Sequence, residues 1–428
     1  MSQRKLLLVA TTVVVLTAAV WTLAARAEAP VQYQFQLLHG FIYGSPDDGS
    51  GPDGSVVLDQ KGNLYGATYG GGTSVYGAVY ELSPGADGQW TEAILYNFPA
   101  APGDGSKPVG LAIDGAGNLY GMTQYGRAND YGTVFELTPV SGGWTETILW
   151  NFCSLPDCAD GGLPSSAPTL GPGGVLYGVA GQTAFQLVPG TDGWSLTPLY
   201  TFCSQPNCAD GQSPDGSPIL DAKGNLYGAT EGGGMKNGEC GEPGCGVTYV
   251  LHPQPGGKWK EFVLHTFQGG DDGYYPQGNV ALYGGALYGT TSSGGTHGIV
   301  GNGTIYELTR GAGKNINEQF PWEFGANAAQ GIEPVGGVVF DNRGDMFGAT
   351  YGGGLASCEC GTVYGMKPQG NGKWGFAVLH SFVGTDGATP DAALTLDSKG
   401  NLYGITGAGG PNEGGVVFEL SPTTQASK

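Results

Sequence analysis

The sequence predicts an all-β chain folded as a seven-bladed β-propeller of four-stranded blades, in which an N-terminal strand completes the last blade. Three observations predict this fold class. The tripeptide Leu-Tyr-Gly or a close variant occurs seven times, at spacings of 50 to 61 residues. Two further signatures follow it in the same order in nearly every copy. The last copy lacks one segment, and a matching segment stands ahead of the first copy.

Each copy contains four short apolar segments separated by Gly, Pro, Asn and Asp, which is typical of strands and not of helices. The first segment precedes an Asp-x-x-Gly-Asn turn such as 59–63, a tight hairpin turn. The second begins with the recurring tripeptide, and a Gly-rich loop follows it. The third resembles "GAVYELSP" (77–84), and the fourth resembles "WTEAILYNF" (90–98). The second segments start at Leu64, Leu119, Leu176, Leu226, Leu287, Met346 and Leu402.

The two ends of this repeat array predict how it closes. The last copy stops after its third strand at 415–422, and "YQFQLLHGF" (33–41) supplies the missing fourth strand. Pairing these two segments would leave no exposed sheet edge, which an open solenoid would have. We therefore expect a closed propeller over residues 31–422, followed by a short tail at 423–428.

Residues 1–27 are interpreted as a secretory signal peptide. They combine a basic start (MSQRK), an apolar stretch (Leu6–Leu23) and small residues at 25–27 (ARA). An uncleaved membrane anchor is the alternative, because this weakly polar to apolar stretch of 18 residues approaches the length of a membrane span. We expect a secreted protein, extracellular or periplasmic, with no membrane contact after cleavage.

The repeat resembles the GloVer tandem-repeat family, whose units carry GNLYGAT, a Gly-Gly loop and GTVYELTP. The resemblance covers nearly all of the chain after the apolar segment and implies a secreted propeller-like repeat protein. It implies no activity. The hairpin turns are also similar to those of NHL-type propellers.

The charge balance argues against nucleic acid as a partner. Only 17 Lys and Arg stand against 37 Asp and Glu, and the basic residues are scattered along the chain. A phosphate backbone needs a clustered basic surface. The partner classes that remain are glycans and proteins, and we expect a monomer without a cofactor or metal.

The irregular loops are all expected on one face of the propeller, between the second and third strands and between successive blades. Long variable loops on a rigid scaffold usually carry the binding residues. We expect this Gly- and Tyr-rich face to bind, with tyrosines as stacking platforms. The candidate binding residues are Tyr69, Tyr125, Tyr351, Arg127, Glu231 and Lys236.

All eight cysteines lie in these loops and form four close pairs. In a secreted chain this pattern predicts local disulfides, and zinc is the alternative. No pair has a well-spaced histidine, which favours disulfides. The expected pairs are Cys153 with Cys158, Cys203 with Cys208, Cys240 with Cys245, and Cys358 with Cys360.

Other ionisable residues recur at fixed repeat positions, which favours structural roles. An Asp-Gly pair follows the fourth strand in six copies and is interpreted as a turn that caps the connection, with a rim of carboxylates for calcium or sugar as the alternative. His39, His265 and His380 replace the tyrosine or tryptophan of other copies on the fourth strand. We therefore expect no catalytic residues among them.

Three functions remain open. The leading one is a non-catalytic binding or scaffold protein for a glycan or protein. The second is an extracellular propeller enzyme acting on a polysaccharide or lactone, and the third is a cell-surface or matrix component. Several different charged groups on the inner strands would favour the enzyme. The inner-strand stretches are instead mostly small and apolar, which favours binding: GSVVLD (54–59), PVGLAID (108–114), SPILDA (217–222) and PVGGVVFD (334–341).

Overall fold

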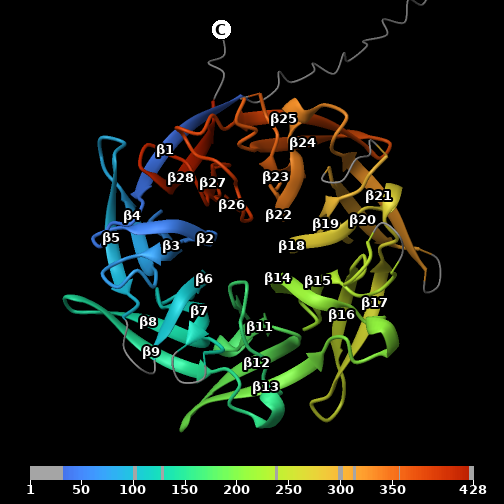
Figure 1. Ribbon diagram of the computed structural model, residues 1–428, viewed down its shortest axis with the longest axis horizontal. Helices are drawn as coiled ribbons and strands as arrows, with labels where there is room; N and C mark the ends of the chain where they lie inside the picture. Colours follow the sequence, from blue (N-terminus) through green and yellow to red (C-terminus); the bar gives the residue numbers. More distant parts are fainter. Residues whose placement is uncertain are drawn as a thin grey trace, which may run out of the picture. The chain divides into compact units, whose positions relative to one another are not determined.

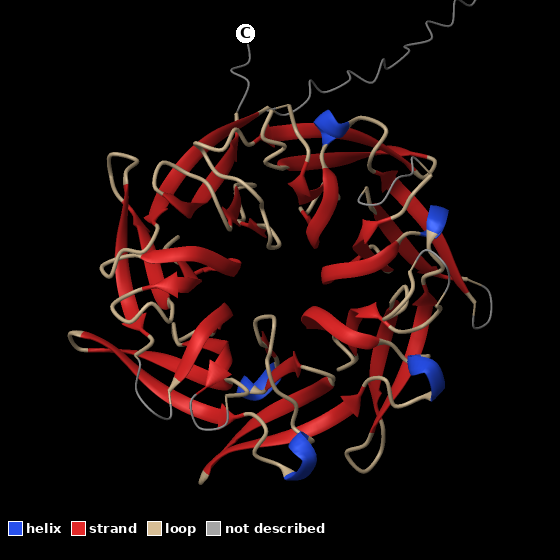
Figure 2. Ribbon diagram, viewed as in Figure 1, coloured by secondary structure: helices blue, strands red, loops and turns tan. Residues whose placement is uncertain are grey.

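The sheets of this protein are built from the four recurring segments. The computed structural model describes residues 32–99, 104–126, 130–236, 240–296, 302–311, 315–355 and 357–423. The expected signal peptide, Arg127 and residues 424–428 lie outside the described residues. Figure 1 shows the sheets arranged radially around a common centre, and Figure 2 shows that strands dominate.

The described strands form five four-stranded sheets and one eight-stranded sheet. A single parallel bridge, between Asn279 and Gly337, joins the two antiparallel halves of the eight-stranded sheet. We call each four-strand group a unit. Units 1 to 3 are β2 (Gly49–Leu58), β3 (Leu64–Gly71), β4 (Ala78–Pro84), β5 (Trp90–Asn97); β6 (Gly105–Ile113), β7 (Leu119–Gly126), β8 (Thr133–Val140), β9 (Gly143–Asn151); and β10 (Thr169–Leu170), β11 (Leu176–Ala180), β12 (Thr183–Gly190), β13 (Gly193–Thr201).

Units 4 to 6 follow the same order, and unit 7 takes its outer strand from the start of the chain. They are β14 (Gln212–Leu220), β15 (Leu226–Gly232), β16 (Val247–Pro253), β17 (Trp259–Thr266); β18 (Tyr274–Tyr283), β19 (Ala286–Ser293), β20 (Thr304–Arg310), β21 (Ile316–Glu323); β22 (Ile332–Phe340), β23 (Met346–Gly352), β24 (Thr362–Gly370), β25 (Lys373–Ser381); and β26 (Thr395–Leu396), β27 (Leu402–Thr406), β28 (Glu413–Pro422), β1 (Tyr33–Ile42).

The first described strand pairs with the last one, as the sequence predicts. β1 runs antiparallel to β28, with Tyr33 opposite Pro422 and Leu37 opposite Phe418. The backbone N–H of Thr423 also donates to the carbonyl of Gln32, at 2.7 Å. The two ends of the described chain are therefore held together by hydrogen bonds.

The core lies between the units and not within them. Seven clusters of buried side chains are found among the described residues, and each joins two neighbouring units. Leu64 packs toward unit 7 and Tyr65 toward unit 2, which explains why the tripeptide presents apolar groups on both sides of its strand. Gly66 is required there because a Cβ would stand 2.2 Å from the Tyr80 hydroxyl.

Short 3₁₀ turns occupy some of the connections. They are η1 (Pro156–Cys158), η2 (Pro172–Gly174), η3 (Pro206–Cys208), η4 (Gly270–Asp272) and η5 (Ala328–Gln330). No helix among the described residues has the length and apolar character that a membrane span requires. The eight cysteines form the four expected disulfides, with Cα–Cα distances of 4.0 to 5.1 Å. Two of them follow the outer strands β9 and β13, and two lie between the second and third strands of units 4 and 6.

Candidate functional site: the central cavity

A repeated turn at the start of each inner strand builds the wall of a central cavity. In every unit a proline follows a residue with φ between 54° and 58°. Proline keeps the preceding residue out of the right-handed helical region, and here that residue takes the left-handed one. The side chain after each proline lines the cavity. In chain order these side chains are Asp53, Val109, Ser165, Asp215, Gln277, Val335 and Asp391.

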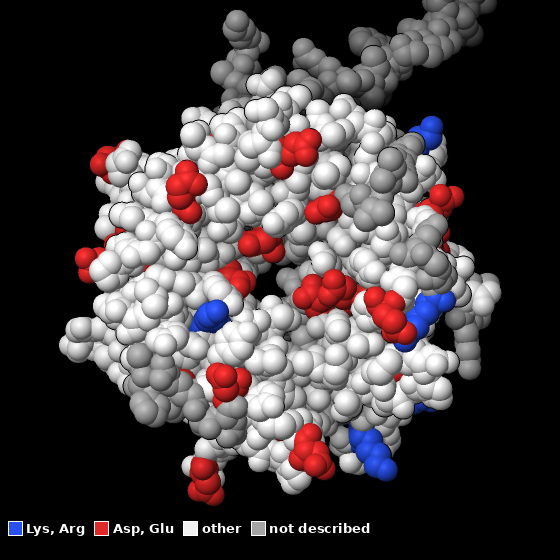
Figure 3. Space-filling view, in the orientation of Figure 1, with Lys and Arg blue, Asp and Glu red and all other residues white. Residues whose placement is uncertain are grey.

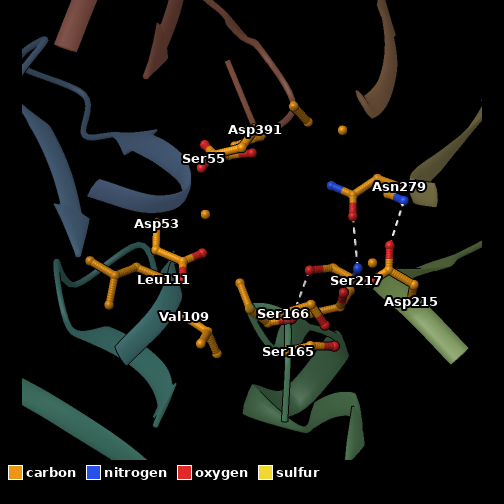
Figure 4. Close-up of a pocket in the computed structure, with 18 of the residues that line it drawn as sticks. Asp53, Ser55, Val109, Leu111, Ser165, Ser166, Asp215, Ser217, Asn279 and Asp391 are labelled. Atoms are coloured by element: carbon orange, nitrogen blue, oxygen red, sulfur yellow. Dashed lines mark hydrogen bonds between the residues drawn. The ribbon is translucent and has the colours of Figure 1, made fainter. Parts of the chain in front are cut away.

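The cavity has a volume of about 650 Å³ and a polar lining on two sides. Figure 4 shows Asp53, Ser55 and Asp391 on one side, and Asp215, Ser217 and Asn279 on the other. On the face shown in Figure 3, acidic side chains surround a central hollow and basic ones are few. The cavity therefore offers many oxygen acceptors.

Asp53 and Asp391 come from the neighbouring units 1 and 7, and the charge of Asp53 affects the ionisation of Asp391. Burial raises the pKa of Asp53 to about 6. Burial raises the pKa of Asp391 to about 8, and the charge of Asp53 adds to this rise. Desolvation thus favours the protonated form of Asp391 more strongly than that of Asp53. Gly407 leaves room for the side chain of Asp391, since a Cβ at position 407 would stand 2.5 Å from Asp391 Oδ2.

Asp215 is held on the opposite side by backbone contacts between units 4 and 5. Its Oδ2 accepts from the backbone N–H of Gly278 at 2.8 Å, and Asn279 Oδ1 accepts from the backbone N–H of Ser217 at 2.7 Å. Gly216 and Gly278 allow the close approach, because a Cβ on Gly216 would stand 2.3 Å from the Gly278 carbonyl oxygen. Asp215 is therefore fixed in position before any ligand enters.

The candidate binding residues predicted from the sequence do not form one site in the structure. Tyr351 is exposed and lines the cavity. Tyr69 and Tyr125 instead share Lys107, whose Nζ lies 4.2 and 5.3 Å from their ring centroids and donates to the Tyr69 hydroxyl at 2.7 Å. The structure therefore brings Tyr69 and Tyr125 together.

Glu231 and Lys236 lie in unit 4. Burial raises the pKa of Glu231, and the charge of Asp215 contributes, which places Glu231 near the cavity carboxylate. Lys236 pairs with Glu242 at 2.7 Å in the loop that the Cys240–Cys245 disulfide closes.

The three cavity aspartates were missed by the sequence analysis. The inner-strand stretches it considered began after Asp53 and Asp215. The signal was present, because aligning the repeats on the proline shows Pro-Asp in units 1, 4 and 7 and a different residue elsewhere. Acids at only some copies of a repeat position indicate a specific role at that position.

Two groups of side chains elsewhere could hold a metal ion; they are His39, Asp48 and Glu92, and His265, Asp272 and Glu318. His265 Nε2 lies 3.0 Å from Asp272 Oδ1 and 3.1 Å from Glu318 Oε1. The repeat favours a hydrogen bond, because in other units the Tyr200 hydroxyl and the Trp150 Nε1–H donate to the equivalent aspartate, at 2.8 and 2.9 Å. A histidine N–H serves the same purpose. The Asp-Gly position thus caps the loop, as expected, and also anchors the preceding strand.

The family model for the Gloeobacter/Verrucomicrobia repeat matches residues 27–184, 181–354 and 236–428. The chain belongs to this family. The match agrees with the resemblance inferred from the repeated motifs. A comparison with curated proteins found no match to this sequence.

Solved structures of similar fold have little sequence in common with this family member. YCF48 from Cyanidioschyzon merolae is 13% identical over 90% of this chain and 98% of its own, with a TM-score of 0.53. The extracellular domain of BT4673 from B. thetaiotaomicron is 11% identical over 93% of this chain and 40% of its own, with a TM-score of 0.51. The gluconolactonase XC5397 from Xanthomonas campestris is 13% identical over 91% and 90%, with a TM-score of 0.42. The two likenesses with TM-scores above 0.5 support an all-β, propeller-like fold alone.

Proposed function

We propose that this repeat protein is a secreted, monomeric, seven-bladed β-propeller that binds a glycan end in its central cavity. Dividing the eight-stranded sheet at its single bridge gives seven four-stranded blades. The pairing of β1 with β28 and the core cluster shared by units 7 and 1 support closure of the ring. Four disulfides suit an oxidising compartment.

The chemistry of the cavity wall carries the binding proposal. Serine hydroxyls, Asn279 and the three aspartates offer donors and acceptors at fixed places around about 650 Å³. Sugar hydroxyls need such paired donors and acceptors, and an exposed aromatic ring supplies a flat apolar face. Tyr351 provides that ring at the cavity wall, while Tyr69 and Tyr125 flank Lys107 on the same loop face.

A glycan array followed by calorimetric titration tests this proposal. We expect Tyr351→Ala and Asp215→Asn each to weaken binding of the selected glycan by about tenfold, since each removes roughly one good contact. Tyr43→Ala is the matched control, because Tyr43 is an exposed tyrosine away from the cavity wall. Equal affinity of Tyr351→Ala and wild type for every glycan that binds would contradict the assignment.

A second candidate function is supported by Asp53 and Asp391. Two nearby carboxyl groups with pKa values of about 6 and about 8 could supply one base and one acid for cleavage of a polysaccharide or lactone. This candidate predicts product release from the bound glycan that both Asp53→Asn and Asp391→Asn abolish. Binding without turnover leaves the scaffold function in place. Concentration-dependent filaments in light scattering would instead favour a matrix component.

A further inference from the structure

An aromatic ring closes the groove between neighbouring units at six of the seven junctions. The ring stands at the start of the outer strand and packs toward the preceding unit, mostly against the aromatic residue of the recurring tripeptide. The ring centroids lie 5.9 to 6.5 Å apart. Five pairs join neighbouring units: Trp90–Tyr403, Trp144–Tyr65, Trp194–Tyr120, Trp259–Tyr177 and Tyr33–Phe347. At the junction of units 5 and 6, Trp374 packs on Phe340 of its own unit, and Phe340 contacts Tyr288 of unit 5.

The junction between units 4 and 5 has no such ring among the described residues. Ile316 pairs with Arg310 in the register in which Trp259 pairs with Pro253, so it occupies the tryptophan position. Among the described residues, Tyr227 consequently has no edge-to-face partner of the kind found at five of the equivalent positions. The groove here measures about 940 Å³, whereas the grooves that contain Trp144 and Trp90 measure about 610 and 590 Å³.

Other departures from the repeat meet at the same groove and remove negative charge. Val250 lies opposite Tyr227 on the next strand, where Glu81 lies opposite Tyr65 in unit 1. In unit 5 a Tyr283–Ala286 hairpin replaces the Asp-led turn that Asp114 begins in unit 2. Both changes occur on the wall of this groove.

A basic group is added where acidic ones are lost. Arg310 stands at a position that is proline in the other units, and Lys223 lies on the facing turn, at a position that is also basic in units 1, 6 and 7. No carboxylate among the described residues forms an ion pair with either of them. In a chain with a formal charge of −20, Arg310 adds a second cation beside Lys223 in a groove that lacks the glutamate present in the Trp144 and Trp90 grooves, Glu81 and Glu419 respectively.

His252 adds a further polar group at the same wall. Its Nδ1 donates to Asn225 Oδ1 at 2.6 Å, and the Asn225 amide in turn donates to Asp221 at 2.8 Å, which fixes the orientation of both side chains. The ring packs edge-to-face on Phe262, an exposed phenylalanine that also lines the groove. The other ring nitrogen, Nε2, is therefore available to a ligand.

From this combination we propose that the groove between units 4 and 5 binds a planar aromatic ligand that carries an acidic group. The ring takes the place that tryptophan fills elsewhere, against Tyr227 and Ile316. The acidic group pairs with Arg310 and Lys223. This site is separate from the central cavity and does not depend on its proposed function.

Indole-3-propionate is a suitable probe, because it combines the missing indole with a carboxylate. We expect it to bind wild-type protein with one-to-one stoichiometry in calorimetric titration. Ile316→Trp restores the repeat residue and should weaken binding by at least about tenfold, while melting stays unchanged or rises. Arg310→Gln should weaken the binding of indole-3-propionate by about tenfold. The binding of 3-methylindole, which has no charge, should be unaffected.

Trp144→Ile is the matched control, because it opens the groove between units 1 and 2, where Glu81 and Asp114 remain. That variant should gain no site for indole-3-propionate. Two results would overturn the proposal: no binding to wild type at millimolar probe, or equal binding by wild type and a folded Ile316→Trp protein. Equal affinity for the amine tryptamine would overturn the assigned charge.

Discussion

Buried glutamates on the outer strands make the residue-scale contacts between units sensitive to pH. Each lies beside the loop aspartate of the preceding unit. Burial is the main cause of the raised pKa values in all four. These values are about 7 for Glu92, about 8 for Glu146, about 7 for Glu261 and about 9 for Glu318.

The remaining junctions show that the glutamate is not required for packing. Leu196, Phe376 and Phe35 stand at the equivalent positions in units 3, 6 and 7. Phe35 stacks on His380 with ring centroids 4.0 Å apart. The histidine pKa values depend on whether a glutamate or a phenylalanine stands at this position. Beside Phe35, burial lowers the pKa of His380. Beside Glu92, the pKa of His39 is raised, because Asp48 and Glu92 outweigh the effect of burial.

We predict that the protein becomes less stable as pH rises from about 4.5 to 9. The folded state keeps protons on these glutamates that the unfolded chain releases near the ordinary value of 4.5, so unfolding becomes easier through this window. Glu318→Gln replaces the carboxyl group by an uncharged amide of the same shape. At pH 5 the variant should have the same free energy of unfolding as wild type. At pH 9 its free energy of unfolding should be higher than that of wild type by about 1 kcal/mol, discounted for partial exposure.

Urea unfolding at both pH values measures this difference. Asp192→Asn serves as the control, since Asp192 is exposed and lies in the hairpin between β12 and β13, within unit 3. A Glu318→Gln protein that loses stability at pH 9 would show that Glu318 is ionised there and holds a cation or an ion pair.

At the scale of elements, most of the architecture could be predicted from the sequence. The repeat fixed the order of strands and the partner of the N-terminal strand, because apolar segments and Asp-Gly turns are local signals. The cavity aspartates and the unit 4–5 groove could not be seen in one copy of the repeat. They follow from how neighbouring units meet, which depends on residues about 50 positions apart or more.

Glycine and proline explain how one unit seats on the next. The glycine that opens the third strand, such as Gly361, has φ of +94°, and a Cβ there would stand 2.6 Å from the Pro390 ring of the following unit. The backbone N–H of Thr389, ahead of that proline, donates to the Cys360 carbonyl at 2.9 Å. The signature glycine is thus a contact between units as well as a turn.

Substitutions in β1 can measure how much its contacts with unit 1 contribute to stability. Phe41 is fully buried, packs edge-to-face on Tyr80 of unit 1 at 5.0 Å, and shares a core cluster with Leu38. We expect Phe41→Ala to lower the free energy of unfolding by about 3–5 kcal/mol, measured by chemical denaturation. Ile42→Ala, at a half-exposed side chain, should change it by less than about 1 kcal/mol. Equal effects would mean that β1 adds little to the core.

At the scale of the whole molecule, the proposed closure depends on one unit being assembled from both ends of the chain. Gln32 and Thr423 are hydrogen-bonded, so a short linker could join them without moving β1 or β28. New ends can then be opened elsewhere, which separates the effect of strand exchange from the effect of the contacts themselves.

Two circular permutants distinguish these effects. Opening the chain between Gly256 and Gly257, in the hairpin between β16 and β17, again leaves one unit completed by an N-terminal outer strand. Opening it between Gly269 and Gly270, between units 4 and 5, leaves every unit continuous and removes strand exchange. We expect the first to melt close to wild type in calorimetry. The second should melt lower and less cooperatively, because the contacts between units 4 and 5, without a sheet shared by both chain ends, then hold the ring shut. If both permutants melt together, strand exchange makes no contribution, and the contacts between neighbouring units alone close the ring.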